Sequence, residues 1–295
     1  MYAEDPLHVH DLPDLREPVI LAAFAGWNDA AQVATHALTT LVDLWSAQRF
    51  AEIDPEPFYS FTDTRPTINI GPAGRRSLHW PSNHFFGHRL ADNERDVVVL
   101  RGTEPNLHWR SFCRTVLSLA DQVGASCLVT LGGLLADVPH TVEPRLTGFA
   151  SAPRLLPQLR QLGVQMSSYE GPTGIIGALH HAWGGADRPA ISLWGNVPHY
   201  ISATPNPQVS LALLRRVSGL LGIDVPLAAL ERQAGAFRTQ VDEALRANPD
   251  AQTYVRQLEQ QLENETPPEP APKLIDELEE FLRSRRPPSE DPPQV

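Results

Sequence analysis

Two short motifs place a histidine directly after a proline. Asp137-Val138-Pro139-His140 follows an apolar run that begins at Cys127, and Asn196-Val197-Pro198-His199 repeats the ending after a second apolar run. Because proline fixes its own φ and restricts the residue before it, each motif is expected to form a turn that directs its histidine one way. Carboxylate and imidazole groups together can support general acid–base chemistry. We expect the two loops to face one pocket; two stiff loops with solvated histidines are the alternative.

Three other apolar runs also end in polar residues. In an open α/β sheet, ligands bind outside the carboxyl ends of the parallel strands. Arg101 could bind a carboxylate or phosphate there, or only pair with Glu104, and Asp29 could cap a helix as readily as contact a ligand. The candidate pocket comprises Asn28, Asp29, Arg101, Glu104, Asp137, His140, Glu170, Thr173, Asn196 and His199.

The motifs of familiar catalytic and cofactor sites are missing. The sequence has no Gly-x-Ser-x-Gly, no HExxH and no CxxC, which disfavours covalent catalysis and a metal site. Gly171, Thr173 and Gly174 precede a predicted helix and could bind an anion, but the lysine and glycine spacing of a P-loop are absent. We therefore assign no catalytic residue, and we expect no cofactor and no metal.

Strands and helices alternate along most of the chain, which predicts an α/β fold. Residues 19–24 and 97–100 read as buried strands, followed by apolar stripes at helical spacing over 33–45 and 107–123. Thr173 could serve as the N-cap of a later helix. The remaining elements are strands at 127–131, 165–169 and 191–194 and helices at 153–162, 175–182 and 209–221, the last ended by Gly222.

Residues 50–100 change to short extended pieces separated by proline and glycine turns. We expect strands at 58–61, 67–70, 77–80 and 85–90, an antiparallel meander inserted into a parallel scheme. The predicted fold is a three-layer α/β/α sandwich with a mixed, mostly parallel central sheet.

Composition divides the chain into three parts. Residues 1–222 form the predicted α/β core, and 223–264 form a helical appendage. Residues 265–295 contain eight prolines and should be largely disordered, with a short amphipathic helix over 274–282 that either docks back on its own domain or fits a partner.

Charge and cysteine content limit the class of protein. The formal net charge of the 295 residues is -11, which opposes binding to nucleic acid. The two cysteines, Cys113 and Cys127, lie in apolar patterns and indicate a reducing compartment. With neither a secretory signal nor an apolar run long enough to span a membrane, the expected location is the cytoplasm.

Five motifs together resemble the proteasome assembly chaperone 2 family, in its bacterial branch. They are GWNDA (26–30), RGTEPNLHWR (101–110), LGGLLADVPHT (131–141), YEGPTG (169–174) and SLWGNVPHY (192–200). The resemblance implies a fold similar to nucleoside phosphorylases, frequent self-association as a dimer or trimer, and, as in eukaryotic relatives, chaperoning of proteasome α-ring assembly without catalysis. Some of those chaperones dock through a C-terminal hydrophobic-tyrosine-any tripeptide, whereas this chain ends Pro293-Gln294-Val295.

Two functions therefore stay open. One is a non-enzymatic assembly chaperone or scaffolding protein with proteasome subunits or another protein as partner. The other is a small-molecule-binding protein or enzyme that uses the polar pocket at the strand ends. Fold does not decide between them, since one fold supports many activities.

Overall fold

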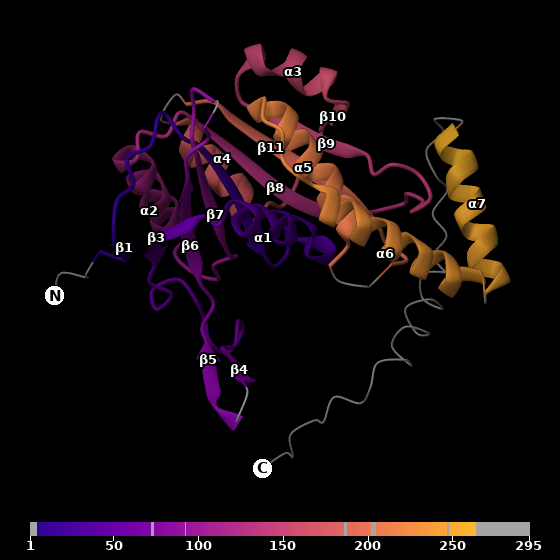
Figure 1. Cartoon of the computed structure of the whole chain (residues 1–295), viewed down its shortest axis with the longest axis horizontal. Coiled ribbons are helices and arrows are strands. Elements are labelled where there is room, and N and C mark those ends of the chain that lie inside the picture. The colour runs from indigo at the N-terminus through magenta and orange to yellow at the C-terminus, as the bar shows by residue number, and fades with distance from the viewer. Residues whose placement is uncertain are drawn as a thin grey trace.

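The computed structural model describes residues 5–71, 74–91, 93–185, 188–201, 205–246 and 248–263. A nine-stranded sheet lies between two layers of helices (Figure 1). The strands, in spatial order, are β1 (Leu7–Val9), β3 (Gln48–Ile53), β6 (Asn83–His88), β7 (Val97–Thr103), β2 (Val19–Ala25), β8 (Cys127–Ala136), β11 (Ala190–Pro198), β9 (Leu146–Ala150) and β10 (Val164–Met166).

The centre of the sheet is parallel. Strands β7, β2, β8 and β11 run the same way, while β6 and β9 flank them antiparallel. The central strands are buried on both faces; every residue of β2 except Ala25 is buried. Continuous apolar runs are typical of parallel strands covered by helices on each side. The predicted three-layer fold with a mixed, mostly parallel sheet is confirmed.

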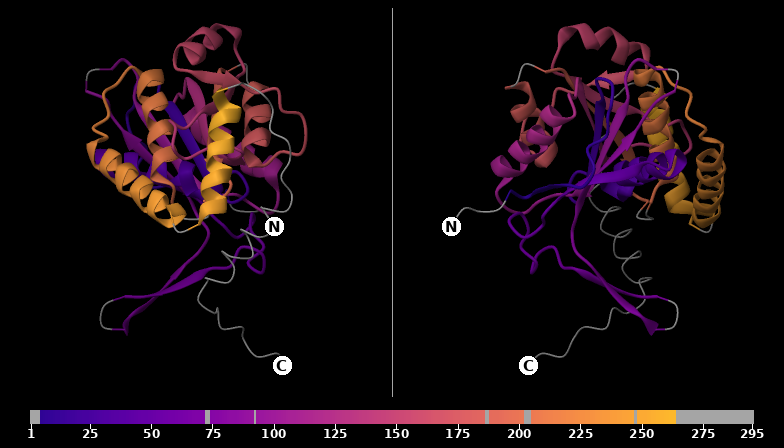
Figure 2. Two further views of the ribbon diagram at one scale, coloured as in Figure 1. Left: turned by 90° about the vertical axis from the view of Figure 1, so that its right-hand side faces the viewer. Right: turned by 60° about the vertical axis from the view of Figure 1, so that its left-hand side comes forward.

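Helices cover both faces of the sheet (Figure 2). On one face α1 (Val33–Trp45), α5 (Pro207–Leu221) and α6 (Ala228–Arg246) share a core with the sheet, and Gly222 ends α5 in the left-handed conformation, as predicted. On the other face lie α2 (Trp109–Gln122) and α4 (Ile175–Gly184), which bury Phe112 and Trp183 completely. Burying one such large side chain contributes roughly 1.5–3 kcal/mol. The remaining helices are α3 (Leu156–Gln161), α7 (Pro249–Glu263) and the short 3-10 turns η1 (Ala30–Gln32) and η3 (Pro153–Leu155).

Several predicted boundaries are wrong. Residues 58–61 form turns instead of a strand, and their aromatic side chains Phe58 and Tyr59 are buried from a loop. Strands β1, β3 and β9 were not predicted, because none of them contains a continuous run of apolar residues. The predicted helix over 274–282 lies outside the described residues, as does the rest of 265–295. The predictions about this tail stay predictions.

The strands that carry the two Val-Pro-His motifs are longer than predicted. Gly132 and Gly133 do not break β8, which continues to Ala136, and Val197-Pro198 completes β11 instead of forming a turn. A Cβ on Gly133 would lie 2.4 Å from the Val33 side chain and 2.9 Å from the Ala30 carbonyl oxygen. Glycine is therefore needed here so that the start of α1 can pack against β8.

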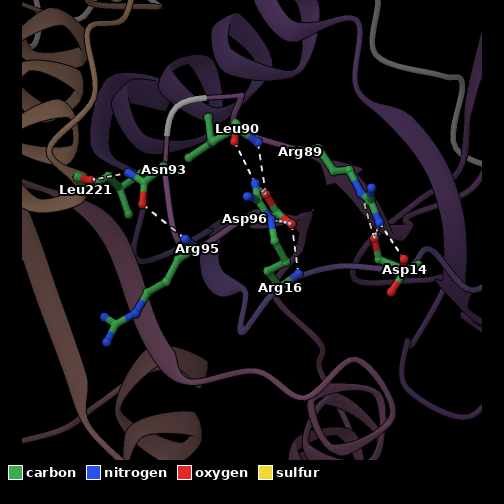
Figure 3. A network of polar contacts seen from close by, with 8 residues as sticks. All are labelled: Asp14, Arg16, Arg89, Leu90, Asn93, Arg95, Asp96 and Leu221. Carbon is green, nitrogen blue, oxygen red and sulfur yellow. Dashed lines mark hydrogen bonds and ion pairs between the residues drawn. The ribbon is translucent and has the colours of Figure 1, made fainter.

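A buried carboxylate ties together the amino-terminal ends of the central strands (Figure 3). Asp96, just before β7, is fully buried and accepts hydrogen bonds from the Arg16 N–H (2.8 Å), Arg16 Nη2 (2.7 Å) and the Leu90 N–H (3.0 Å). Nearby, Arg89 pairs with the exposed Asp14 at 2.6 Å. These contacts fix the loops at the edge of the sheet opposite the candidate pocket.

A two-stranded ribbon projects away from the body of the molecule (Figures 1 and 2). It consists of β4 (Thr67–Ile70) and β5 (Arg76–His79), and every residue of both strands is exposed. At its base, the ring of Trp80 meets that of Phe61 edge-on at 4.7 Å.

Among the described helices, none combines the length and apolar character required to cross a membrane.

Candidate functional site

Glu104 links the ends of β2 and β7 to the start of α4 through its carboxylate. It follows β7 and accepts hydrogen bonds from the Trp27 N–H (3.2 Å), Asn28 Nδ2 (2.8 Å) and the Ile175 N–H (2.8 Å). We call this group of four residues the Glu104 cap. Because Ile175 is the first residue of α4, the carboxylate lies at the positive end of that helix, where a negative charge is stabilising.

The Glu104 cap explains what the Gly171-Pro172-Thr173-Gly174 segment does. A Cβ on Gly174 would lie 2.5 Å from Glu104 Oε1 and 2.2 Å from Asn28 Nδ2, so a larger residue here would displace these two hydrogen-bonded side chains. Gly174, and not Thr173, is the N-cap residue of α4, which corrects the predicted role of Thr173. The predicted anion position at this helix is thus filled by the protein's own carboxylate.

Asp29 is a capping residue within a buried environment. Its carboxylate accepts from the Ala34 N–H at 2.8 Å and from the Thr35 hydroxyl, both in the first turn of α1. Burial raises the pKa of the Asp29 carboxyl, and the hydrogen bonds from Thr35 and Ala34 oppose that rise. Asp29 is therefore directed toward α1, in agreement with the capping alternative.

The first Val-Pro-His loop contacts helices α6 and α7. The Tyr200 hydroxyl accepts from the His140 N–H at 2.7 Å and lies 2.7 Å from His140 Nδ1, while His140 Nε2 lies 3.0 Å from Asp242 on α6. Burial raises the pKa of the Tyr200 hydroxyl, so it keeps its proton and can donate to Nδ1. With Nδ1 facing the Tyr200 hydroxyl, His140 Nε2 is placed to donate to Asp242.

The second loop carries this tyrosine directly after His199. His199 Nδ1 lies 3.1 Å from Asp137, and His199 Nε2 lies 3.3 Å from the Tyr254 hydroxyl on α7. The rings of His140 and His199 both meet the Tyr200 ring nearly at right angles, at 5.8 and 5.7 Å. Tyr200 of the second loop thus joins that loop to His140 of the first. We call the whole set the histidine–tyrosine cluster: Asp137, His140, His199, Tyr200, Asp242 and Tyr254.

The ten candidate residues fall into separate groups instead of one pocket. Asn28 and Glu104 share the Glu104 cap, and Asp137, His140 and His199 share the histidine–tyrosine cluster. Arg101 donates to Thr39 on α1 at 3.1 Å and lies 5.5 Å from the Phe86 ring centre, and it forms no ion pair with Glu104 among the described residues. Glu170 is exposed, and no hydrogen bond or ion pair within the described ranges involves its side chain. A ligand-binding role for these residues stays a prediction.

Asn196 lies in a small hollow beside the histidine–tyrosine cluster. The hollow is bounded by the loop over 138–145, the end of β11, the start of α5 and Leu262 of α7. His140, Arg145 and Asn196 contribute polar groups to it, and Asn196 Oδ1 is buried without a hydrogen-bond partner in the described part of the chain.

Within the described residues, no group of three or more histidine, cysteine, aspartate or glutamate side chains is placed to bind a metal ion.

The histidine–tyrosine cluster is expected to attach α7 to the body. Tyr200 and Ile201 pack with Val255 and Leu258 of α7 in a small apolar cluster. Tyr200→Phe leaves the His140 N–H without its acceptor, which costs about 1–3 kcal/mol when the group is buried. Hydrogen exchange of α7 amides should become faster, while exchange in β2 stays the same.

Tyr169→Phe is the matched control, because its hydroxyl bonds the Pro172 carbonyl (2.9 Å) on an exposed loop. Unchanged α7 exchange in Tyr200→Phe would show that the cluster does not attach this helix.

Three members of the histidine–tyrosine cluster were not predicted as site residues from the sequence: Tyr200, Asp242 and Tyr254. Tyr200 directly follows His199, so its place beside a predicted site residue was a usable signal. Asp242 and Tyr254 lie on helices whose polar faces contain many similar residues, and nothing in their spacing separates them from solvent-exposed positions.

The chain was compared with known families and structures. The PAC2 family matches residues 23–245. No curated protein matches the chain. A PAC2 family protein from Streptomyces avermitilis is 40% identical in sequence over 81% of this chain and 99% of its own, with a TM-score of 0.73.

Two further structures carry descriptions that mention the proteasome. A proteasome-assembly chaperone homologue from Mycobacterium tuberculosis is 41% identical over 80% of this chain and 99% of its own, with a TM-score of 0.73. An archaeal proteasome activator from Pyrococcus furiosus shares the fold, at 20% identity over 81% and 97% of the two chains and a TM-score of 0.65. By the match over 23–245 and the identity to its bacterial relatives, this chain belongs to the PAC2 family.

Proposed function

We propose that this protein is a non-enzymatic assembly chaperone or scaffolding protein that acts on proteasome subunits. The observation that carries the proposal is the 41% identity to a protein described as a proteasome-assembly chaperone homologue, over nearly the whole of that protein. The fold shared with an archaeal proteasome activator is consistent with it. The proposal includes a cytoplasmic location and self-association as a dimer or trimer.

The contacts of the candidate residues support a binding role over catalysis. A general acid or base has to reach the proton that it transfers. Glu104 is occupied by three internal donors, and His140 is bonded at both ring nitrogens. Polar groups that satisfy one another stabilise loops, and stable loops suit a surface that recognises another protein.

The test is co-purification from the native host. Tagged full-length protein is expected to enrich proteasome α or β subunits, or their precursors, at least about tenfold over a tagged acidic protein of similar size and net charge. Such a control matters because a chain with a formal charge of -11 attracts basic proteins nonspecifically.

A second measurement addresses the chaperone role itself. Adding the purified protein to purified proteasome subunits should speed the formation of rings, as followed by native gel electrophoresis. Absence of proteasome subunits from the captured material, together with an unchanged rate of ring formation, would contradict the proposal.

A further inference from the structure

The sheet face that carries α4 remains open to solvent at β9. Leu146 and Ala150 of β9 pack in the core shared with α3, on the opposite face, so the alternating residues Thr147 and Phe149 point to the α4 side. Phe149 lies beside α4, with its ring 6.5 Å from that of His180, and 50% of its surface is exposed. A large apolar side chain with this exposure is available for a further contact.

Two more apolar side chains adjoin Phe149. On β11, Trp194 lies diagonally across from Phe149 and packs partly on the α4-side core. On β8, Leu134 lies diagonally across from Trp194 and is 37% exposed. Its neighbour Gly133 approaches α1 on the other face, so Leu134 points to the α4 side. Diagonal neighbours on one face of a sheet are close enough for large side chains to touch. We define the sheet patch as Leu134, Phe149 and Trp194.

The segment over 274–282 has a matching apolar stripe in its sequence. An exposed apolar patch on a soluble protein marks a contact surface. This segment lies outside the described part of the chain, and its acidic residues fill the positions between the apolar ones. A helix of this length is marginal in water and needs a surface to pack against. The apolar residues, which recur at helical spacing, are Leu274, Ile275, Leu278, Phe281 and Leu282.

The described chain ends close to the sheet patch. Leu262, near the end of α7, lines the same hollow as Arg145, which directly precedes β9. Phe149 follows Arg145 along this strand by about 13 Å, at roughly 3.3 Å per residue. Residues 264–273 are rich in proline and can span roughly 30 Å at about 3.1 Å per residue. The connecting segment is thus long enough to place residues 274–282 on the sheet patch.

Charge and tethering both favour this segment as the occupant. Arg145 is exposed at the end of β9, and the polar positions of 274–282 are acidic throughout: Asp276, Glu277, Glu279 and Glu280. Opposite charges on two surfaces favour their association. A segment joined by a short linker has an effective concentration in the millimolar range, which favours it over a second copy or a separate partner.

We propose that residues 274–282 dock as a short helix on the sheet patch of the same molecule. The apolar stripe packs against Leu134, Phe149 and Trp194, and the acidic side chains lie near Arg145. The docked segment covers the exposed aromatic ring and extends the α4 layer over β9. This inference goes beyond the proposed function, and it stands whether or not proteasome subunits bind.

Hydrogen exchange of the full chain, followed by mass spectrometry, tests the proposal. In the wild type, amides of 274–282 should exchange at least about tenfold more slowly than an unstructured peptide of the same sequence. Leu134→Ser with Phe149→Ser should remove this protection. Phe149→Lys, a single change at a half-exposed position, should give the same loss and guards against misfolding of the double variant.

Leu44→Ser is the matched control, an exposed leucine on α1 and thus on the opposite side of the sheet. It should keep the protection of 274–282. Exchange in the central strand β2 should be the same in all of these proteins, which shows that the variants fold. Protection should also be equal at about 1 and 50 µM protein, because docking within one molecule does not depend on concentration.

Three outcomes overturn the proposal. The first is free exchange of 274–282 in the wild type. The second is protection that the sheet-patch variants leave unchanged, which would place the segment elsewhere. The third is protection that increases with protein concentration, which would assign the sheet patch to a second copy. All three can occur while proteasome subunits still co-purify, so failure here is distinct from failure of the proposed function.

Discussion

Glu104→Ala is expected to lower the free energy of unfolding by about 3 kcal/mol. The substitution removes the acceptor of three hydrogen bonds and leaves the Trp27, Asn28 and Ile175 donors without a partner. Hydrogen bonds to charged groups contribute roughly 1.5–3 kcal/mol, and the loss of a charge at the start of α4 adds to this. Urea denaturation followed by circular dichroism measures the change.

Two variants separate the sources of that loss. Glu104→Gln keeps one acceptor oxygen but removes the charge, and it should lose about half as much. Glu170→Ala removes an exposed carboxylate from the neighbouring loop and should stay within about 0.5 kcal/mol of the wild type. Equal stability of Glu104→Ala and Glu170→Ala would refute the cap.

Asp96→Ala should cost a similar amount, about 3 kcal/mol. The carboxylate is fully buried, and its removal leaves Arg16 without its partner and the Leu90 N–H without its acceptor. Breaking a buried pair by removing one member typically costs 3–5 kcal/mol, and the lower value fits because Arg16 is half exposed and can regain water. Asp14→Ala is the control, since Asp14 pairs with Arg89 on the open surface.

The Asp96 contribution should also depend on pH. Burial raises the pKa of the Asp96 carboxyl. The hydrogen bonds from Arg16 and from the Leu90 N–H lower that pKa by more than burial raises it, so the pKa lies below its ordinary value. A group with a depressed folded pKa stabilises the protein above its unfolded pKa of about 3.9 and loses that effect as the pH falls through the folded pKa. The stability difference between wild type and Asp96→Asn should be constant above about pH 5 and shrink below pH 4. A difference that stays constant down to pH 3 would contradict this assignment.

The local spacing of apolar residues was sufficient to predict most of the fold. Buried parallel strands are apolar along their whole length, and the helices that cover them carry one apolar stripe, so β2, β7, α1 and α5 could be read directly. Residues 58–61 were wrongly predicted as a strand because aromatic side chains favour strands. In the structure, Phe58 packs into the core from a turn. Tertiary packing overrides local propensity at such positions.

The candidate site was predictable only in part. The strand ends that carry Asn28, Glu104, His140 and His199 follow from the alternation of strands and helices. Which side chains pair with which does not, because Glu104 meets Ile175 from 71 residues away and His140 meets Asp242 from 102 residues away. Such pairings depend on how the loops pack against α4 and α6.

The two outer strands of the sheet limit how copies of this protein can associate. Both β1 and β10 are only three residues long, so neither border offers a long row of free backbone groups. Short borders discourage a sheet from growing by adding strands from neighbouring molecules. Contacts between molecules are thereby left to side chains, whose identity can be selective, and indiscriminate fibre-like growth is avoided.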